Sequence, residues 1–152
     1  MLSEGWFKID KNIGNFDTDY FCDFEEMIFP VPGSNRITSP YGYRIHPIKK
    51  IKKFHSGIDI GDDEGSDVVA VLDGVVAYSG LLGGYGETIV ILNGNNVATL
   101  YAHNSKLLAN VGDKVEKGDI ISKVGSTGSS TGPHLHFEIK INNVPIDPML
   151  YL

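Results

Sequence analysis

Short hydrophobic runs, several of them alternating with polar residues, follow one another from residue 37 to the end of the chain. Runs of four to eight such residues, bounded by Gly, Asn or Asp, are typical of β-strands. Short strands at regular spacing predict an all-β, antiparallel fold, either a β-sandwich or a partly open barrel of the barrel-sandwich hybrid kind. The predicted strands include Val68–Leu72, Val75–Tyr78, Thr88–Leu92, Val97–Ala102, Ile120–Val124 and Leu135–Ile141.

Turn residues separate these strands. Asp73-Gly74 stands between the first two, and Asn93-Gly94-Asn95-Asn96 stands between the next two, so each pair is expected to form a hairpin. Asn142-Asn143 turns the chain after the last strand. A helix fits the pattern in only two places, near Asp23–Ile28 and at Ser105–Ala109.

Residues 1–30 differ from the remainder because they hold many aromatic and acidic residues without strong alternation. Pro30-Val31-Pro32-Gly33 marks the junction. We therefore divide the chain into an N-terminal extension, residues 1–30, and one folded domain, residues 31–152. The extension is expected to pack on the domain or to dock to a larger assembly. A chain of 152 residues is long enough for a single domain with one core.

The composition excludes several function classes. The net charge of −6 provides no global basic field for nucleic acid or an anionic membrane. Cys22 is the only cysteine, so an intramolecular disulfide and a cysteine-based zinc site are both excluded. The first residues lack the features of a secretory signal, and no apolar run approaches membrane-spanning length, so neither a signal peptide nor membrane insertion is expected.

A local basic cluster departs from this acidic balance. It is either a solvated loop or part of a cleft rim that meets an anionic polymer. The cluster comprises Lys49, Lys50, Lys52 and Lys53.

A His-x-His pair, His134 and His136, lies in the last long predicted strand. Because alternate side chains of a strand share a face, both imidazoles and Glu138 are expected on one face, opposite the core-facing Leu135 and Phe137. Two imidazoles on one face suit metal binding, and a hydrated face of an edge strand is the alternative.

A second cluster is His55-Ser56-Gly57-Ile58-Asp59. His and Asp are both zinc ligands, but four residues of straight strand span about 13 Å, which is too far for one ion. A bend at Ser56-Gly57 would bring the two together, and Gly57 provides the backbone freedom for it. Alternatively, Asp59 is a turn or hydrogen-bonding residue. His103, at a predicted strand end, is either functional or a surface or capping residue.

The segment Gly125–Gly132 is rich in Gly and Ser. It does not match a phosphate-binding loop, because no Lys follows it and no helix is predicted after it. It is either a surface loop or a functional loop beside a cleft.

Taken together, these motifs resemble those of the lysostaphin-like, LytM-type zinc metallopeptidases, which cut peptidoglycan. The matching segments are His55-x-Gly57-x-Asp59, Tyr101-Ala102-His103 and Gly128-x-Ser130-Thr131-Gly132-Pro133-His134-Leu135-His136, and the resemblance covers roughly residues 35–148.

The resemblance implies that His55, Asp59 and His136 bind Zn²⁺ and that His103 and His134 are catalytic residues that do not bind the metal. None of these positions is substituted. Three protein ligands leave a coordination position open, as in catalytic zinc sites. The chain has no His-Glu-x-x-His helix, so a neutral histidine is the natural base, and the sequence does not indicate which of the two acts so.

The resemblance further implies an endopeptidase that hydrolyses peptide bonds in peptidoglycan stem peptides or cross-bridges, acting at the bacterial cell wall or as part of a phage tail. One alternative is a non-catalytic cell-wall-binding or morphogenetic protein on the same fold. A cupin-type metal enzyme is disfavoured, because the His-x-His pair here follows the other candidate ligands.

Four residues have secondary expectations. Arg44 and His46 are cleft-wall or structural residues, and Tyr85 lies in a loop along the groove. Glu138 either supports a metal ligand or is an ordinary exposed acid.

Overall fold

The computed structural model describes residues 26–45 and 50–152, and in them the regular elements are β-strands and two short 3-10 helices. The strands are β1 (Ile37–Ser39), β2 (Gly42–Ile45), β3 (Lys52–His55), β4 (Ile58–Gly61), β5 (Asp67–Val69), β6 (Gly74–Leu81), β7 (Glu87–Gly94), β8 (Val97–Asn104), β9 (Lys106–Leu107), β10 (Lys114–Val115), β11 (Ile120–Lys123), β12 (His134–Ile141) and β13 (Val144–Ile146). The 3-10 helices are η1 (Gly83–Tyr85) and η2 (Pro148–Leu150).

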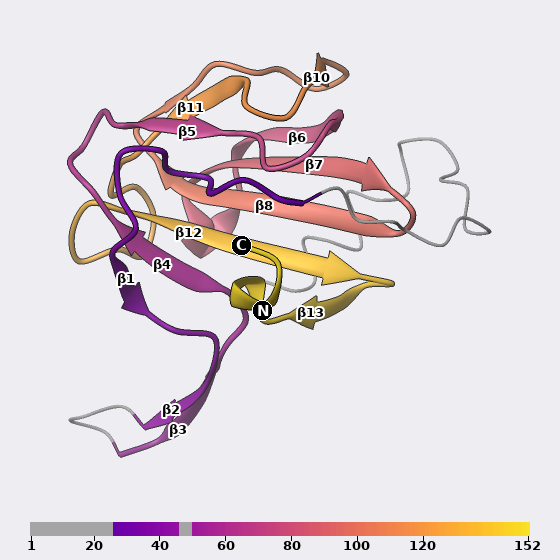
Figure 1. Ribbon diagram of the computed structural model, residues 1–152. Helices are drawn as coiled ribbons and strands as arrows, with labels where there is room; N and C mark the ends of the chain where they lie inside the picture. The colour runs from indigo at the N-terminus through magenta and orange to yellow at the C-terminus, as the bar shows by residue number, and fades with distance from the viewer. Residues whose placement is uncertain (1–25, 46–49) are drawn as a thin grey trace.

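The strands of the described residues form three antiparallel sheets. The largest has the order β1-β4-β12-β8-β7-β6-β10, with β13 paired to the end of β12. A three-stranded sheet, β5-β11-β9, lies across one face of it, and the β2–β3 hairpin projects away from the body (Figure 1). The large sheet ends at β1 and β10 and does not close on itself, so the predicted all-β antiparallel fold is confirmed as an open, layered form.

The main core lies between the large sheet and the three-stranded sheet. Alternate residues of β4 and β12 point into it, as the period-two pattern predicts. They pack with residues of β5, β11 and the adjoining loops, and all are almost completely buried. The cluster includes Ile58, Ile60, Leu135, Phe137 and Ile139 from the large sheet and Val68, Val71, Ile121 and Val124 from the other layer.

The opposite face of the large sheet carries a second, smaller apolar cluster. Leu100 and Ala102 of β8 belong to it, together with Tyr85 of η1. The polar residues of β12 share this face with the cluster, because Glu138 is paired with Leu100 and His136 with Ala102. Histidines and a carboxylate therefore lie on a partly covered face of the sheet.

The hairpin prediction around Asn93–Asn96 is confirmed. β7 and β8 are paired, and Asn95 and Asn96 have φ values of 54° and 61°, the left-handed backbone of a tight hairpin turn. Asn142 and Asn143 make a similar turn between β12 and β13.

The hairpin prediction around Asp73-Gly74 is wrong. β5 pairs with β11, whereas β6 pairs with β7 and β10, so the chain changes sheets at this turn. A turn signal reports a reversal of the chain and does not determine which strands then pair.

The helix prediction at Ser105–Ala109 is also wrong, because β9 occupies this segment and pairs with β11. Of the helix expected near Asp23–Ile28, residues 23–25 lie outside the described residues, and the part from residue 26 to residue 28 is not helical. The extension expected over residues 1–30 also lies almost entirely outside the described residues.

The described part of the chain has no helix with the length and hydropathy needed to cross a membrane.

Candidate active site

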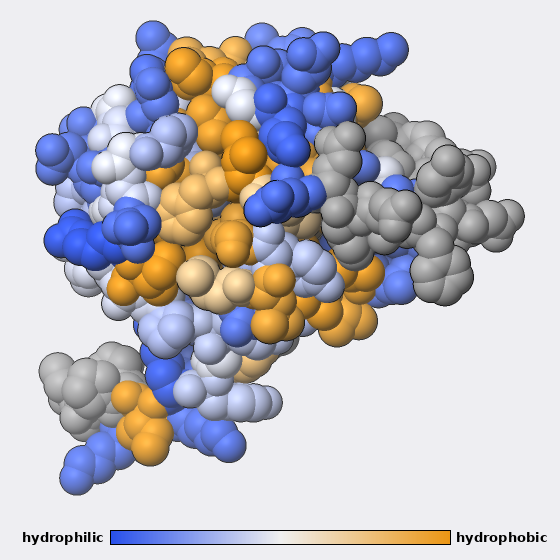
Figure 2. Space-filling model, in the orientation of Figure 1, coloured by the Kyte–Doolittle hydropathy of each residue, from blue (hydrophilic) through white to orange (hydrophobic). Residues whose placement is uncertain are grey.

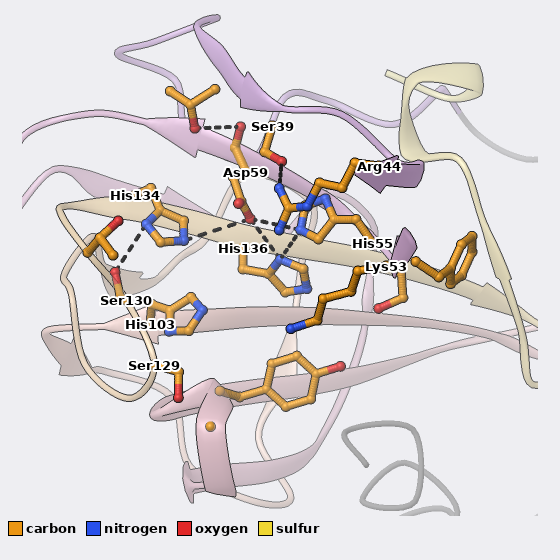
Figure 3. Close-up of a pocket in the computed structure, with 16 residues that line it drawn as sticks. Ser39, Arg44, Lys53, His55, Asp59, His103, Ser129, Ser130, His134 and His136 are labelled. Atoms are coloured by element: carbon orange, nitrogen blue, oxygen red, sulfur yellow. Dashed lines mark hydrogen bonds and ion pairs between the residues drawn. The ribbon is translucent and has the colours of Figure 1, made fainter. Parts of the chain in front are cut away.

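Figure 3 shows His55, Asp59 and His136 turned toward one another on the partly covered face of the large sheet. The His55 Nε2 atom lies 3.3 Å from Asp59 Oδ1 and 3.3 Å from His136 Nδ1. The His136 Nδ1 atom lies 2.8 Å from Asp59 Oδ1. Among the described residues, these three form a group that could hold a metal ion, so the structure brings together the three side chains expected to bind zinc.

The backbone accounts for this convergence. Asp59 and His136 are directly opposite each other in the register of β4 and β12, and such residues share a face. His55 ends β3, and the chain bends at Ser56 and Gly57 before β4 begins, as the sequence predicted. A Cβ atom on Gly57 would lie 2.2 Å from the Phe137 carbonyl oxygen, so only glycine permits the bend to pack against β12.

The hydrogen bonds of the two imidazoles determine which ring nitrogens face Asp59. The His55 Nδ1 atom lies 2.9 Å from the Pro40 carbonyl oxygen, which can only accept, so Nδ1–H donates and Nε2 keeps a lone pair. The His136 Nε2 atom lies 2.8 Å from Glu138 Oε2 and donates to this carboxylate, which leaves Nδ1 with a lone pair.

Two lone pairs and a carboxylate oxygen thus converge on one point. In a tetrahedral zinc site with bonds of about 2.1 Å, neighbouring donor atoms are roughly 3.4 Å apart. The two separations of 3.3 Å match this spacing, and the third is slightly shorter. Three electron-rich atoms this close repel one another unless a cation lies between them, so the donor set fits Zn²⁺.

The pKa values of Asp59 and His136 also indicate that this site favours a positive charge. Burial favours a higher pKa for Asp59, but in the metal-free site its contacts with His136 and His55 outweigh burial and hold the pKa well below its usual range. Burial disfavours the charged form of His136, but its contacts with Asp59 and Glu138 raise its pKa to about 9. In the absence of a metal, a proton on His136 supplies the positive charge that these acids attract.

His134 lies beside this group, with Nε2 3.7 Å from Asp59 Oδ1. Its Nδ1 atom lies 2.8 Å from the Gly132 carbonyl oxygen and donates to it, so Nε2 is the unprotonated nitrogen of the neutral ring. Because His134 and His136 alternate on β12, the strand places both imidazoles on one face, as the sequence predicted.

His103 reaches the same site by a backbone irregularity. Ala102 already faces His136, so regular alternation would turn His103 to the other side of the sheet. The φ of His103 is 64°, outside the β region, and its ring centroid lies 4.8 Å from that of His134. Its Nδ1 atom donates to the Thr127 carbonyl oxygen at 2.6 Å. Burial lowers the pKa of His103, which keeps the ring neutral at pH 7.

Glu138 and Tyr85 complete the surroundings of His136. Glu138 is only 1% exposed, so the expectation of an ordinary exposed acid is wrong. Its Oε2 atom accepts hydrogen bonds from both the His136 ring and the Tyr85 hydroxyl. The sequence placed Glu138 on the correct face, but nothing in it connected Tyr85, which lies 53 residues earlier, to this carboxylate.

The site opens into a cleft of about 680 Å³. The loop predicted to lie beside a cleft does so, through Ser129, Ser130 and Thr131. Arg44 also lines the cleft and donates a hydrogen bond to Ser39. Tyr85 lines the cleft as well, as expected, whereas His46 lies outside the described residues.

Relatives of known name share this sequence pattern. A DD-carboxypeptidase/endopeptidase Mpg of Neisseria meningitidis is 48% identical over 114 residues, covering 75% of this chain and 26% of the relative. The murein hydrolase activator NlpD of Salmonella dublin is 39% identical over 99 residues, covering 64% of this chain and 26% of the relative. The chain thus spans about a quarter of the length of these curated relatives.

Solved structures share the fold. A zinc-containing peptidase from Vibrio cholerae has a TM-score of 0.76 and 35% identity, covering 80% of this chain and 38% of the other. The catalytic domain of lysostaphin from Staphylococcus simulans has a TM-score of 0.67 and 33% identity, covering 76% of this chain and 90% of the other.

The model of peptidase family M23 matches residues 53–148, which hold all five of the residues singled out above, from His55 to His136. This match covers more than half of the chain. The chain therefore belongs to peptidase family M23.

Proposed function

We propose that this chain is a zinc-dependent endopeptidase that hydrolyses peptide bonds in the stem peptides or cross-bridges of bacterial peptidoglycan. The observation that carries the proposal is the convergence of His55 Nε2, His136 Nδ1 and Asp59 Oδ1 within one cleft. Membership of a peptidase family and the similarity to a DD-carboxypeptidase/endopeptidase support it.

In this proposal, His55, Asp59 and His136 hold Zn²⁺. Bound there, the ion would polarise the scissile carbonyl group and lower the pKa of a water molecule. The Pro40 carbonyl oxygen accepts a hydrogen bond from His55, and the Glu138 carboxylate accepts one from His136. These two acceptors determine which ring nitrogen each histidine would turn toward the ion.

His103 and His134 handle protons in the proposed reaction. Each donates Nδ1–H to a backbone carbonyl and so keeps an unprotonated Nε2 atom, and the rings lie beside each other. One can accept the proton of the attacking water, and the other can stabilise the developing oxyanion or return a proton to the leaving amine. Both roles suit neutral rings, and the lowered pKa of His103 supports this assignment.

The place of action in this proposal is the bacterial cell wall, because peptidoglycan peptides are the substrate. Since the chain spans about a quarter of its curated relatives, the activity of any longer protein is part of the same proposal.

The similarity to a murein hydrolase activator favours a second candidate, a protein of this fold that binds cell-wall components without cutting them. The complete set of metal-binding and proton-transferring side chains supports the peptidase over this candidate.

Purified cell walls test the proposal. The metal-loaded protein should contain about one zinc per chain and release muropeptides whose masses identify the bond that is cut. His103→Ala and His134→Ala should keep the zinc and lose hydrolysis, whereas His55→Ala should lose both. A zinc-loaded protein that binds cell walls and releases no muropeptide would support the non-catalytic candidate instead.

A further inference from the structure

The β2–β3 hairpin, here called the arm, protrudes from the body (Figures 1 and 2), and several of its residues line the cleft. In its register Gly42 is opposite His55, and Arg44 is opposite Lys53. Directly opposite residues share a face, and so do alternate residues of one strand. Arg44 and Lys53 therefore lie on the same face of the arm as His55, the candidate zinc ligand.

This face of the arm forms part of the wall of the cleft. Arg44, Lys53 and His55 all line the cleft together with His103 and His134. Figure 3 shows the Lys53 side chain extending from the arm along the cleft near the histidines. Both Arg44 and Lys53 are exposed, so a ligand in the cleft can reach their charged groups.

Two like charges directly opposite each other on paired strands are unfavourable unless an anion neutralises them. Among the residues that the structure describes, neither Arg44 nor Lys53 has a carboxylate partner. Arg44 donates to the Ser39 hydroxyl group, while Asp59 and Glu138, the acids of the site, are bound to histidines. Within the described residues, the arm thus presents two cations to the cleft that no carboxylate neutralises.

Lys52, in contrast to Arg44 and Lys53, lies on the other face of the arm. Its amino group lies 4.4 Å from the centre of the Tyr43 ring, a cation–π contact. The chain as a whole carries a net charge of −6, so the attraction for an anion at Arg44 and Lys53 is local to the cleft.

We propose that Arg44 and Lys53 form a subsite that binds a carboxylate group of the substrate peptide beside the metal centre. This inference rests on the proposed peptidase function and names the charge that the substrate carries. An arginine and a lysine can both donate to the oxygens of one carboxylate, which fixes the peptide relative to the scissile bond. The carboxylate is either the C-terminus of a stem peptide or a side chain within it.

Cross-linked stem peptides in three forms test the subsite: all carboxylates free, the C-terminus amidated, or the side-chain carboxylates amidated. Lys53→Gln and Arg44→Gln should each lower kcat/KM for the free peptide about tenfold, mainly through KM. Lys52→Gln, the matched control from the other face of the arm, should change kcat/KM for the free peptide by less than about twofold. Raising the ionic strength should reduce kcat/KM for the wild type more than for Lys53→Gln.

On the amidated peptide that lacks the recognised carboxylate, the wild type and Lys53→Gln should have the same kcat/KM. The amidated form on which the two proteins have the same kcat/KM identifies whether the recognised carboxylate is the C-terminus or a side chain. If Lys53→Gln and Lys52→Gln have the same kcat/KM on every peptide, the subsite is refuted while the peptidase function stands.

Calorimetric titration of the same peptides into zinc-loaded His134→Ala protein separates binding from hydrolysis. If the wild type cuts no peptide but the Lys53→Gln substitution still weakens binding of the free peptide alone, the peptidase function fails and the subsite stands. If this substitution leaves binding of all three peptides unchanged, the subsite is overturned.

Discussion

The Nδ1 atom of His136 lies 2.8 Å from Oδ1 of Asp59, and the two residues are directly opposite each other on β12 and β4. The register of the sheet therefore sets the separation of two of the three candidate ligands. The other nitrogen of His136 is held by Glu138, so the sheet and this carboxylate together orient the ring.

Replacing Glu138 should weaken metal binding without touching a ligand. Glu138→Gln keeps an oxygen acceptor for His136 and Tyr85 but loses the charge, and Glu138→Ala loses both. We expect zinc affinity to fall about tenfold for the first variant and up to about 100-fold for the second, measured by competition with a chelating dye. Glu116→Gln, at an exposed position, is the control. Unchanged affinity in both Glu138 variants would show that the carboxylate does not support the site.

Gly57→Ala should destabilise the fold. The new Cβ atom would lie 2.2 Å from the Phe137 carbonyl oxygen, so the bend at Gly57 must move away from β12. We expect the free energy of unfolding to fall by about 3 kcal/mol, measured by urea denaturation. Gly132→Ala is the matched control, because its new Cβ would have no atom within 4 Å beyond its chain neighbours, and it should lose less than about 0.5 kcal/mol. Equal losses in both variants would contradict the packing argument.

Ionisation of the Tyr101 hydroxyl group should make the free energy of unfolding depend on pH in the alkaline range. Burial raises the pKa of its hydroxyl group to about 12, above the ordinary value of 10.0 that applies to the unfolded chain. Its contribution to stability is complete below pH 10 and is lost as the pH rises toward 12. The advantage of the wild type over Tyr101→Phe should therefore shrink by about 1 kcal/mol between about pH 9 and 11.

Urea denaturation of the two proteins across this pH range measures the effect, because other groups titrate equally in both. At neutral pH, Tyr101→Phe should already cost about 1–3 kcal/mol, since the Val71 N–H loses its acceptor and the Thr99 hydroxyl loses a hydrogen-bond partner. A stability difference that does not change with pH would mean that the hydroxyl group ionises as readily in the folded protein as in the unfolded chain.

Removing the metal should lower both activity and thermal stability. A ligand present at 1,000 times its Kd stabilises the folded state by about 4 kcal/mol, so a chelator should lower the Tm and added zinc should restore it. His103→Ala should keep this zinc-dependent shift, because His103 is outside the ligand group, whereas His55→Ala should lose it. A Tm that is insensitive to chelation in the wild type would count against the metal centre.

Part of the site was predictable because it depends on local rules. Strand alternation placed His134 and His136 on one face, and the spacing of His55 and Asp59 required the bend that Gly57 makes. The β7–β8 hairpin was predictable for the same reason, since its turn and both strands are adjacent in the sequence.

The remainder depends on long-range pairing and on single backbone angles. Nothing in the sequence around His103 indicated the φ of 64° that turns its ring into the site. The contact from Tyr85 to Glu138 forms only once η1 packs over β12, and the partners of β5 and β6 are set by the packing of two sheets. These features follow from the tertiary fold and not from any short segment.

The candidate ligands come from two different sheets. His55 ends a strand of the arm, whereas Asp59 and His136 belong to the body. An ion bound by all three would act as a crosslink between the arm and the body, anchored at the base of the hairpin. Arg44 and Lys53, which line the cleft from the same arm, would be held more firmly in place by such an ion. The ion would thus couple the position of the proposed carboxylate subsite to the presence of the proposed catalytic metal.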